Sequence, residues 1–297
     1  MIVVTNPGSN LPTSLVEAYG IEVTPQQIIV DGVAHDTRDG VSFDQIDKWV
    51  KTAKEHPYVL GTNAGEFAAL FARLAQRDKD ILAVMTSRKI IGSFNGAQVA
   101  SRTVSERHPD VHITVADCGV TDLGAGLACI LAAEARDAGL DATQIAELID
   151  TFREHVRFVV VPKTLDYIVK GGRASSMRAF FAELFGVRPL VAFVDGEIRA
   201  VGKASAKGDP TTAISDWLVQ NVGPKRPAWV GVFHGGSPAV AAILQKELRS
   251  RFDVRYCLSR PLAPSIYLHA GPEAIGAVVV PLDALPWQPT KVLADGD

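Results

Sequence analysis

Hydroxyl and amide side chains lie at two positions where a predicted strand is followed by a predicted helix. Thr62 and Asn63 precede one helical segment, and Gly92 and Ser93 precede another. Backbone N–H groups at a helix N-terminus attract anions, and a hydroxyl donates readily to an oxyanion. These four residues therefore predict a site for a carboxylate or a phosphate group. The alternative is that they serve only as helix caps.

An arginine and a histidine are two further candidates. Arg173 follows two glycines in the segment KGGRAS, where a guanidinium could form a bidentate contact with a carboxylate or a phosphate. His269 precedes a Gly-Pro pair in YLHAGPEAIG and could donate a hydrogen bond to a ligand oxygen. The alternatives are a solvated arginine behind a glycine C-cap and a loop histidine without a ligand.

Motifs for other chemistry are absent or weak. The sequence has no G-x-x-x-x-G-K-[ST] loop and no G-x-S-x-G elbow, and no cluster of ligating residues has the spacing of a metal site. Cys118, at the end of a predicted strand, could be a thiolate, but a small turn residue is the simpler interpretation. We therefore expect no catalytic residue, no metal and no cofactor.

Periodicity predicts an α/β protein of two domains. Over residues 1–155, strand-like runs alternate with helical segments, which favours an N-terminal domain with a parallel sheet. Over residues 156–297, hairpins are mixed with helices, which favours a C-terminal α+β domain with a mixed sheet. No Pro/Gly-rich linker separates the two, so we expect the domains to pack closely.

Local signals predict several turns and caps. Asp-Gly pairs at 31–32 and 195–196 are typical of β-hairpin turns. Thr62 or Asn63 is expected to cap one helix, and Thr143 is expected to cap another. These predictions depend only on neighbouring residues.

Composition limits the function classes and the compartment. The chain has 297 residues, 47% of them apolar, a net charge of −3 and no basic block, so a nucleic-acid groove is not expected. No run approaches the roughly 18 apolar residues of a membrane span, and the start MIVVTNPGSN lacks the pattern of a signal peptide. Three cysteines without a CxxC pair favour a reducing compartment. We therefore expect a soluble, cytoplasmic protein.

Taken in order, these segments resemble the DegV family of bacterial fatty-acid-binding proteins. The resemblance covers nearly the whole chain and depends on the order of these pieces: Thr5 with Leu11-Pro12, Thr62 before a helix, GSFNGA at 92–97, Asp117, KGGR at 170–173, RPLVAFVDGEI at 188–198 and HAGPEAIG at 269–276. It implies two α/β domains that hold one long-chain fatty acid in the cleft between them. It also implies a carrier without turnover of its own that, in some bacteria, presents the carboxylate to a separate fatty acid kinase.

Carried over by position, Thr62, Ser93, Arg173 and His269 match functional positions of the family. The resemblance implies that hydroxyls at the strand ends hold the carboxylate, with the arginine and the histidine nearby. Asn63 and Gly92 flank the two hydroxyls and complete the expected ligand site.

The sequence departs from the family pattern in four places. The family's Thr-Asp-Ser start reads Thr5-Asn6-Pro7 here, and its Thr-Ser pair reads Thr62-Asn63. Ile91 stands in place of the first serine of a Ser-Gly-Thr-Tyr turn, and Gly202, next to Lys203, stands in place of an arginine. The change at Ile91 removes a hydroxyl from the expected head-group site. These departures bear on head-group chemistry and on coupling to a kinase more than on the fold.

A fatty acid also needs an apolar slot. About fourteen buried CH₂ groups contribute up to roughly 11 kcal/mol, at about 0.8 kcal/mol each, before ordering costs are subtracted. Two segments could line the slot: FFAELF (Phe180, Phe181, Leu184, Phe185) and PLVAFV (Leu190, Val191, Phe193). The alternative is that both belong to the core of the second domain.

Three hypotheses on function follow. The leading one is a carrier that binds a long-chain fatty acid at the inter-domain cleft. The second is an enzyme for a small phosphorylated or carboxylated substrate, with Arg173 and Lys203 as anion clamps and His269 as general acid/base. The third is a regulator with a vestigial cleft, which the missing serine would suit.

Overall fold

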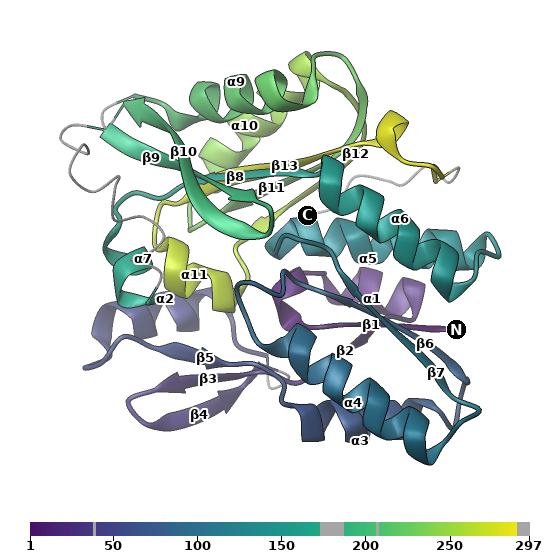
Figure 1. Cartoon of the computed structure of the whole chain (residues 1–297). Helices are drawn as coiled ribbons and strands as arrows, with labels where there is room; N and C mark the ends of the chain where they lie inside the picture. The colour runs from purple at the N-terminus through teal and green to yellow at the C-terminus, as the bar shows by residue number, and fades with distance from the viewer. Residues whose placement is uncertain (38–39, 173–186, 206–207, 290–297) are drawn as a thin grey trace.

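Two β-sheets dominate the computed structural model, and a layer of helices lies between them (Figure 1). The structure describes residues 1–37, 40–172, 187–205 and 208–289. The mixed α/β architecture has one fully parallel sheet in the N-terminal half and a separate mixed sheet in the C-terminal half. The predicted fold class is therefore confirmed.

The first sheet is parallel throughout, in the order β2-β1-β6-β7. Its strands are β1 (Ile2–Thr5), β2 (Glu22–Val23), β6 (Asp80–Met85) and β7 (His112–Asp117). All four residues of β1 and the last five of β6 are buried. Both faces of these strands are covered by helices, which explains why their sequences are almost continuously apolar.

Helices pack on both faces of the parallel sheet (Figure 1). On one face lie α3 (Ala64–Leu74) and α4 (Ser93–Arg107), and on the other lie α1 (Thr13–Tyr19), α5 (Asp122–Asp137) and α6 (Ala142–His155). Helix α5 is buried along most of its length because it also packs against the second sheet. One hydrophobic cluster therefore runs from the parallel sheet through α5 into the C-terminal half.

Helix caps agree with the sequence at one site and differ at another. The Asn63 side chain accepts hydrogen bonds from the backbone of Gly65 and Glu66, and Glu66 completes a capping box. The prediction for Thr143 is wrong, because α6 begins earlier and Asp141 is its N-cap. Asp141 forms a reciprocal capping box with Gln144, which satisfies two backbone donors at once.

The second sheet has the order β10-β9-β8-β13-β11-β12. Its strands are β8 (Arg157–Val161), β9 (Val187–Val194), β10 (Glu197–Ser205), β11 (Pro227–His234), β12 (Asp253–Pro261) and β13 (Ile275–Pro281). Strands β11 and β12 pair in parallel, and its other described pairs are antiparallel. Helices α9 (Pro210–Val222) and α10 (Pro238–Arg251) pack on its outer face.

A small third sheet was not predicted as a separate unit. It has the order β4-β3-β5, with β3 (Gln27–Val30), β4 (Val33–Asp36) and β5 (Tyr58–Leu60). The predicted hairpin turn at 31–32 is confirmed, and both of its residues have positive φ, as a type I′ turn requires. The sequence between β4 and β5 contains α2 (Phe43–Thr52).

Helix α2, which follows β4 of this third sheet, packs against α11 (Pro264–Ala270) of the C-terminal half. The rings of Phe43 and Tyr267 meet edge to face, with centroids 5.0 Å apart, and the Tyr267 hydroxyl donates to Asp47. These contacts position α11, which carries His269. In the described ranges, no helix is long and apolar enough to cross a membrane.

Candidate ligand-binding cavity

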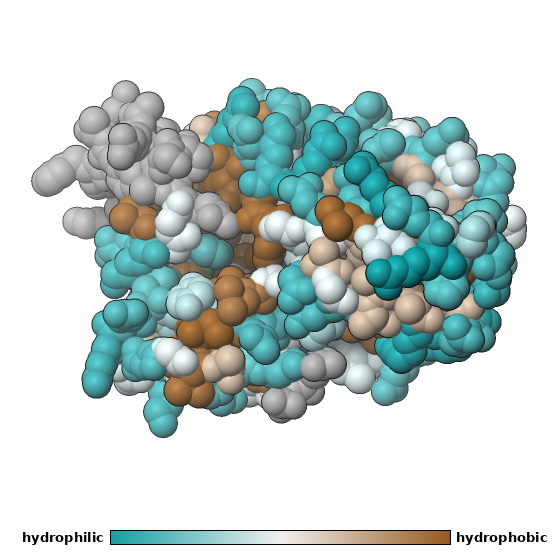
Figure 2. Space-filling view, turned by 60° about the horizontal axis from the view of Figure 1, so that its bottom comes forward, coloured by the Kyte–Doolittle hydropathy of each residue, from teal (hydrophilic) through white to brown (hydrophobic). Residues whose placement is uncertain are grey.

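A cavity of about 290 Å³ lies between the parallel sheet and the mixed sheet. Figure 2 shows hydrophobic residues gathered around a hollow on the face turned toward the viewer. The mixed sheet contributes these apolar residues to the lining: Phe158, Val160, Val191, Phe193, Ile198 and Phe233. The N-terminal half contributes these residues: Asn6, Gly8, Gln26, Tyr58, Val59, Thr86, Ile90, Ile91 and Thr121. The cavity is therefore apolar on one side and partly polar on the other.

Strand β9 divides its side chains between the cavity and the core. Val191 and Phe193 line the cavity, whereas Leu190 belongs to the core beneath α9. This division follows from the two-residue period of a strand. The Phe193 ring also meets the Phe158 ring edge to face at 5.1 Å. One face of PLVAFV thus lines the cavity and the other belongs to the core, and an acyl slot at the first face stays a prediction.

Ser93 places a buried hydroxyl next to the cavity wall. It is the first residue of α4 and is 1% exposed, and its Oγ has no hydrogen-bond partner within the described part of the chain. A carbon added at Gly61 would lie 2.8 Å from this Oγ and 3.1 Å from Ile91, so Gly61 leaves the space that both side chains occupy. Ile91 itself lines the cavity. A buried donor without a partner is costly, which favours a ligand oxygen at this position.

Thr62 is also buried, but its hydroxyl is already engaged. It donates to the carbonyl of Pro25 at 2.5 Å and lies 2.8 Å from the hydroxyl of Thr24. These contacts fix the segment before β3 against the start of α3. A ligand would have to compete with the Pro25 carbonyl for the Thr62 proton.

Asn63 and Gly92 are exposed and lie outside the cavity lining. The side chain of Asn63 is used to cap α3, and an added carbon at Gly92 would meet nothing within 4 Å. The second glycine of this turn has a packing role instead. An added carbon at Gly96 would lie 3.2 Å from the Thr62 carbonyl oxygen, so Gly96 permits close packing of α3 and α4.

His269 lines the cavity from α11, and its ring packs against the KGG segment. An added carbon at Gly171 would lie 2.0 Å from Nδ1 of His269. In the reverse direction, an added carbon at Gly271 would lie 2.3 Å from the ring of Tyr167 in α7 (Asp166–Lys170). The two glycine motifs, about 100 residues apart in the sequence, are therefore packed against each other.

The remaining predicted site residues fall elsewhere. Arg173 lies outside the described residues, as do Phe180, Phe181, Leu184 and Phe185. Lys203 is exposed on β10, and Gly202 follows an irregularity in the pairing of β10 with β9. Within the described ranges, the cavity therefore combines His269, Val191 and Phe193 of the predicted residues, with Ser93 and Thr62 close to its polar side.

Polar residues of the N-terminal half largely pair with one another at the cavity. Asn6 donates to the Thr86 hydroxyl at 3.1 Å, and the Thr121 hydroxyl donates to the carbonyl of Gly8 at 3.3 Å. Gln26 and Tyr58 were not among the candidates identified from the sequence. No local signal could have found these two, because the third sheet reaches the cavity only through the tertiary fold.

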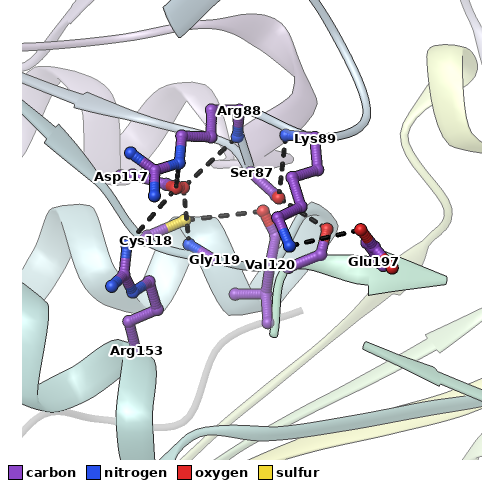
Figure 3. Close-up of polar contacts among 10 residues, drawn as sticks. Ser87, Arg88, Lys89, Asp117, Cys118, Gly119, Val120, Arg153 and Glu197 are labelled. Atoms are coloured by element: carbon purple, nitrogen blue, oxygen red, sulfur yellow. Dashed lines mark hydrogen bonds and ion pairs between the residues drawn. The ribbon is translucent and has the colours of Figure 1, made fainter. Parts of the chain in front are cut away.

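A polar latch holds the β9–β10 hairpin against the N-terminal half (Figure 3). The Ser87 hydroxyl donates to the carbonyl of Gly196 at 2.7 Å, and the Lys89 ammonium lies 3.2 Å from Glu197. The hairpin turn at 195–196 was predicted and is confirmed. Because Phe193 lies just before this turn, the latch fixes one wall of the cavity.

Beside the latch, Asp117 is buried between two arginines (Figure 3). Its carboxylate lies 3.4 Å from Arg88 and 3.5 Å from Arg153, and it accepts a hydrogen bond from the backbone of Gly119 at 2.9 Å.

The adjacent Cys118 is fully buried, and burial raises the pKa of its thiol well above the ordinary value. Cys118 is thus a packed thiol, as the simpler interpretation held. Within the described ranges, no group of three or more His, Cys, Asp and Glu residues could hold a metal ion.

Known proteins resemble this chain along nearly its whole length. A family profile described as "Uncharacterised protein, DegV family" matches residues 1–282. A DegV domain-containing protein of Streptococcus pyogenes is 28% identical over 280 residues, which cover 94% of this chain and 97% of the relative. A DegV domain-containing protein of Mycobacterium bovis is 29% identical over 282 residues, with 94% and 96% covered.

Solved structures share the fold. A DegV family protein from Thermus thermophilus, described for its fatty acid binding, superposes with a TM-score of 0.86 at 22% identity and covers 95% of this chain and 99% of its own. DegV of Bacillus subtilis, described as a fatty acid binding protein, superposes with a TM-score of 0.82 at 22% identity and covers 94% and 98%. The match of the family profile over residues 1–282, with relatives that span the same length, shows that this chain belongs to the DegV family.

Proposed function

We propose that this protein binds one long-chain fatty acid in the cavity between domain 1–155 and domain 156–297. The observation that carries the proposal is an apolar cavity whose partly polar side lies next to the buried, unpartnered hydroxyl of Ser93, as far as the described residues extend. The acyl chain lies against the wall formed by β8 and β9. The tail provides most of the affinity, because each buried CH₂ contributes about 0.8 kcal/mol.

The carboxylate lies at the polar side, near Ser93, Thr62 and His269. A buried carboxylate needs hydrogen-bond donors, since leaving it unpaired is costly. Ser93 can donate without losing a described protein partner, whereas Thr62 must give up the Pro25 carbonyl. Solved DegV structures described as binding fatty acids support this function for the chain. A solved structure with the same fold, from Eubacterium ventriosum, is described as that of a stearic acid-binding protein.

The protein acts as a carrier that presents the carboxylate to a partner kinase, with no turnover of its own. The test is to denature the purified protein, extract it with organic solvent and identify the extract by mass spectrometry. Stoichiometric fatty acid supports the carrier. A phosphorylated small molecule would support an enzyme instead, and an empty cavity that takes up no added lipid would support a regulator.

A second measurement tests the carrier directly. A ligand that binds only the native state raises the melting temperature. Delipidated protein should therefore melt at a higher temperature when saturated or monounsaturated fatty acids are added. Acyl phosphate formed only when carrier, kinase and ATP are combined would support the partner. The absence of any thermal shift with every acid tested would refute fatty acid binding.

A further inference from the structure

Gln26 presents an unpartnered amide oxygen to the cavity. The residue is 3% exposed, directly precedes β3 and lines the cavity. Its Oε1 is buried and has no hydrogen-bond partner among residues 1–37, 40–172, 187–205 and 208–289. Three polar residues on the same side of the lining differ in this respect, since Asn6 and Thr86 pair with each other and Thr121 bonds to the Gly8 carbonyl. The amide oxygen of Gln26 is therefore available to a ligand.

Gln26 lies near the end of the cavity at which the proposed function places the carboxylate head group. The carbonyl of Pro25, the preceding residue, accepts the hydrogen bond of the Thr62 hydroxyl. The backbone of Thr62 in turn packs against Gly96 of α4, the helix that Ser93 begins. Gln27 pairs with Leu60, and the next residue, Gly61, lies against the Ser93 hydroxyl. The backbone of Gln26 is therefore close to both hydroxyls that the proposed function assigns to the carboxylate.

The chemistry of the amide restricts the partner. A primary amide offers an acceptor oxygen and a donor nitrogen, and a buried acceptor that stays unpaired is costly. A carboxylate can only accept hydrogen bonds, so a plain fatty acid leaves Oε1 unpaired. A hydroxyl group both donates and accepts, and can pair with either end of the amide.

We propose that Gln26 recognises a hydroxyl group close to the carboxyl end of the ligand, so that the cavity prefers a 2-hydroxy or 3-hydroxy fatty acid over the unsubstituted acid of equal length. This inference rests on the proposed function and narrows its ligand class. The preference comes from one hydrogen bond made inside a buried cavity. A plain acid still binds, because the tail makes the same apolar contacts.

The test compares myristic acid with 2-hydroxymyristic and 3-hydroxymyristic acid. Each competes with a fluorescent acyl probe on the delipidated full chain, on Gln26→Leu and on Gln26→Met. The wild type should bind at least one hydroxy acid about three- to tenfold more tightly than myristic acid. Both variants should lose this preference and bind myristic acid at least as tightly as the wild type. The matched control is Gln27→Leu, because Gln27 is the adjacent glutamine on β3 and lies outside the cavity lining.

Thermal melts keep the result interpretable. Replacing a buried amide whose oxygen is unpaired by an apolar side chain should leave the melting temperature unchanged or raise it, so at least one of the two variants should fold normally. If the wild type has no preference, or if both variants retain it, the role of Gln26 is overturned while fatty acid binding stands. If no acid displaces the probe from the wild type, the proposed function and this inference fail together.

Discussion

The ring of His269 occupies the space that a side chain at Gly171 would need, since an added carbon would lie 2.0 Å from Nδ1. The φ of Gly171 is −75°, so its backbone conformation is open to any residue. Among the described residues, it is the contact with this ring that requires glycine here. The pair therefore joins α7 to α11 and sets the position of the histidine at the cavity.

Gly171→Ala should displace the His269 ring. Overpacking of this kind typically lowers the free energy of unfolding by about 1–3 kcal/mol. We expect a lower melting temperature and weaker fatty acid binding. The control is the double variant Gly171→Ala/His269→Ala, in which removal of the ring makes space for the methyl group. The double variant should have a higher free energy of unfolding than Gly171→Ala alone. If chemical denaturation shows that the double variant loses the sum of the two single losses, the contact is contradicted.

Ser93→Ala should affect binding and leave stability unchanged. Its hydroxyl has no hydrogen-bond partner in the chain as described, so its removal costs the folded protein nothing. A hydrogen bond to a charged acceptor contributes about 1.5–3 kcal/mol, so fatty acid affinity should fall by roughly tenfold or more. The matching methyl ester should be much less affected, as competition against a fluorescent acyl probe at fixed pH will measure.

Ser101 on the same helix provides the control for this prediction. Its hydroxyl donates to the carbonyl of Gln98, away from the cavity lining. Ser101→Ala should leave both affinities unchanged. If Ser93→Ala weakens the acid and the ester equally, Ser93 does not contact the carboxylate.

Gly196→Ala should loosen the latch of the β9–β10 hairpin. Gly196 has φ +79°, and an added carbon would lie 2.8 Å from the Ser87 hydroxyl. The left-handed conformation alone costs a non-glycine residue about 1–2 kcal/mol. The matched control is Gly32→Ala in the other Asp-Gly turn, where φ is +83° and nothing lies within 4 Å.

The free energy of unfolding should therefore fall in both variants because of the backbone conformation. In Gly196→Ala it should fall by a further ~1 kcal/mol because of the contact with Ser87. Urea denaturation measures the two losses. The release rate of bound fatty acid should rise for Gly196→Ala only, because Phe193 forms part of the cavity wall. Equal losses and equal release rates would show that the hairpin contact contributes nothing.

Asp122 should make stability depend on pH. Burial raises the pKa of its carboxyl group from 3.8 to about 6, although Asn10 and the backbone of Ala263 and Leu123 donate hydrogen bonds to it and Arg260 lies nearby. In that interval the folded state holds more protons at Asp122 than the unfolded state. The contribution of Asp122 to the free energy of unfolding is therefore fully present below about pH 4 and is lost as the pH rises through about 6.

Asp122→Asn removes this titration and should flatten the stability curve between pH 4 and 6. Asparagine tolerates the positive φ of 51° at this position, so the backbone should not be strained by the change. Chemical denaturation at a series of pH values, taken as the difference between wild type and variant, measures the effect. Asp137→Asn at the exposed end of the same helix is the control. A difference that is constant across this range would contradict the raised pKa.

Local sequence determined the parts of the fold that depend on neighbouring residues. Asn63 caps α3, and the Asp-Gly pairs at 31–32 and 195–196 form hairpin turns, because a cap or a tight turn is decided within a few residues. The alternation of strands and helices likewise predicted the parallel sheet. The misplaced cap at Thr143 is an error of two residues, since Asp141 offered an equally good local signal with a better partner in Gln144.

Only the tertiary structure decided which side chains meet at the cavity. Thr62 and Ser93 look equivalent in the sequence, yet one hydroxyl is bonded to Pro25 and the other has no partner among the described residues. Val191 lies on the face of the mixed sheet that lines the cavity, and Gln26 reaches the cavity from the position directly before a third sheet that the sequence pattern did not separate. Hydrogen-bond partners and burial depend on segments that are distant in the chain, so no local pattern could reveal them.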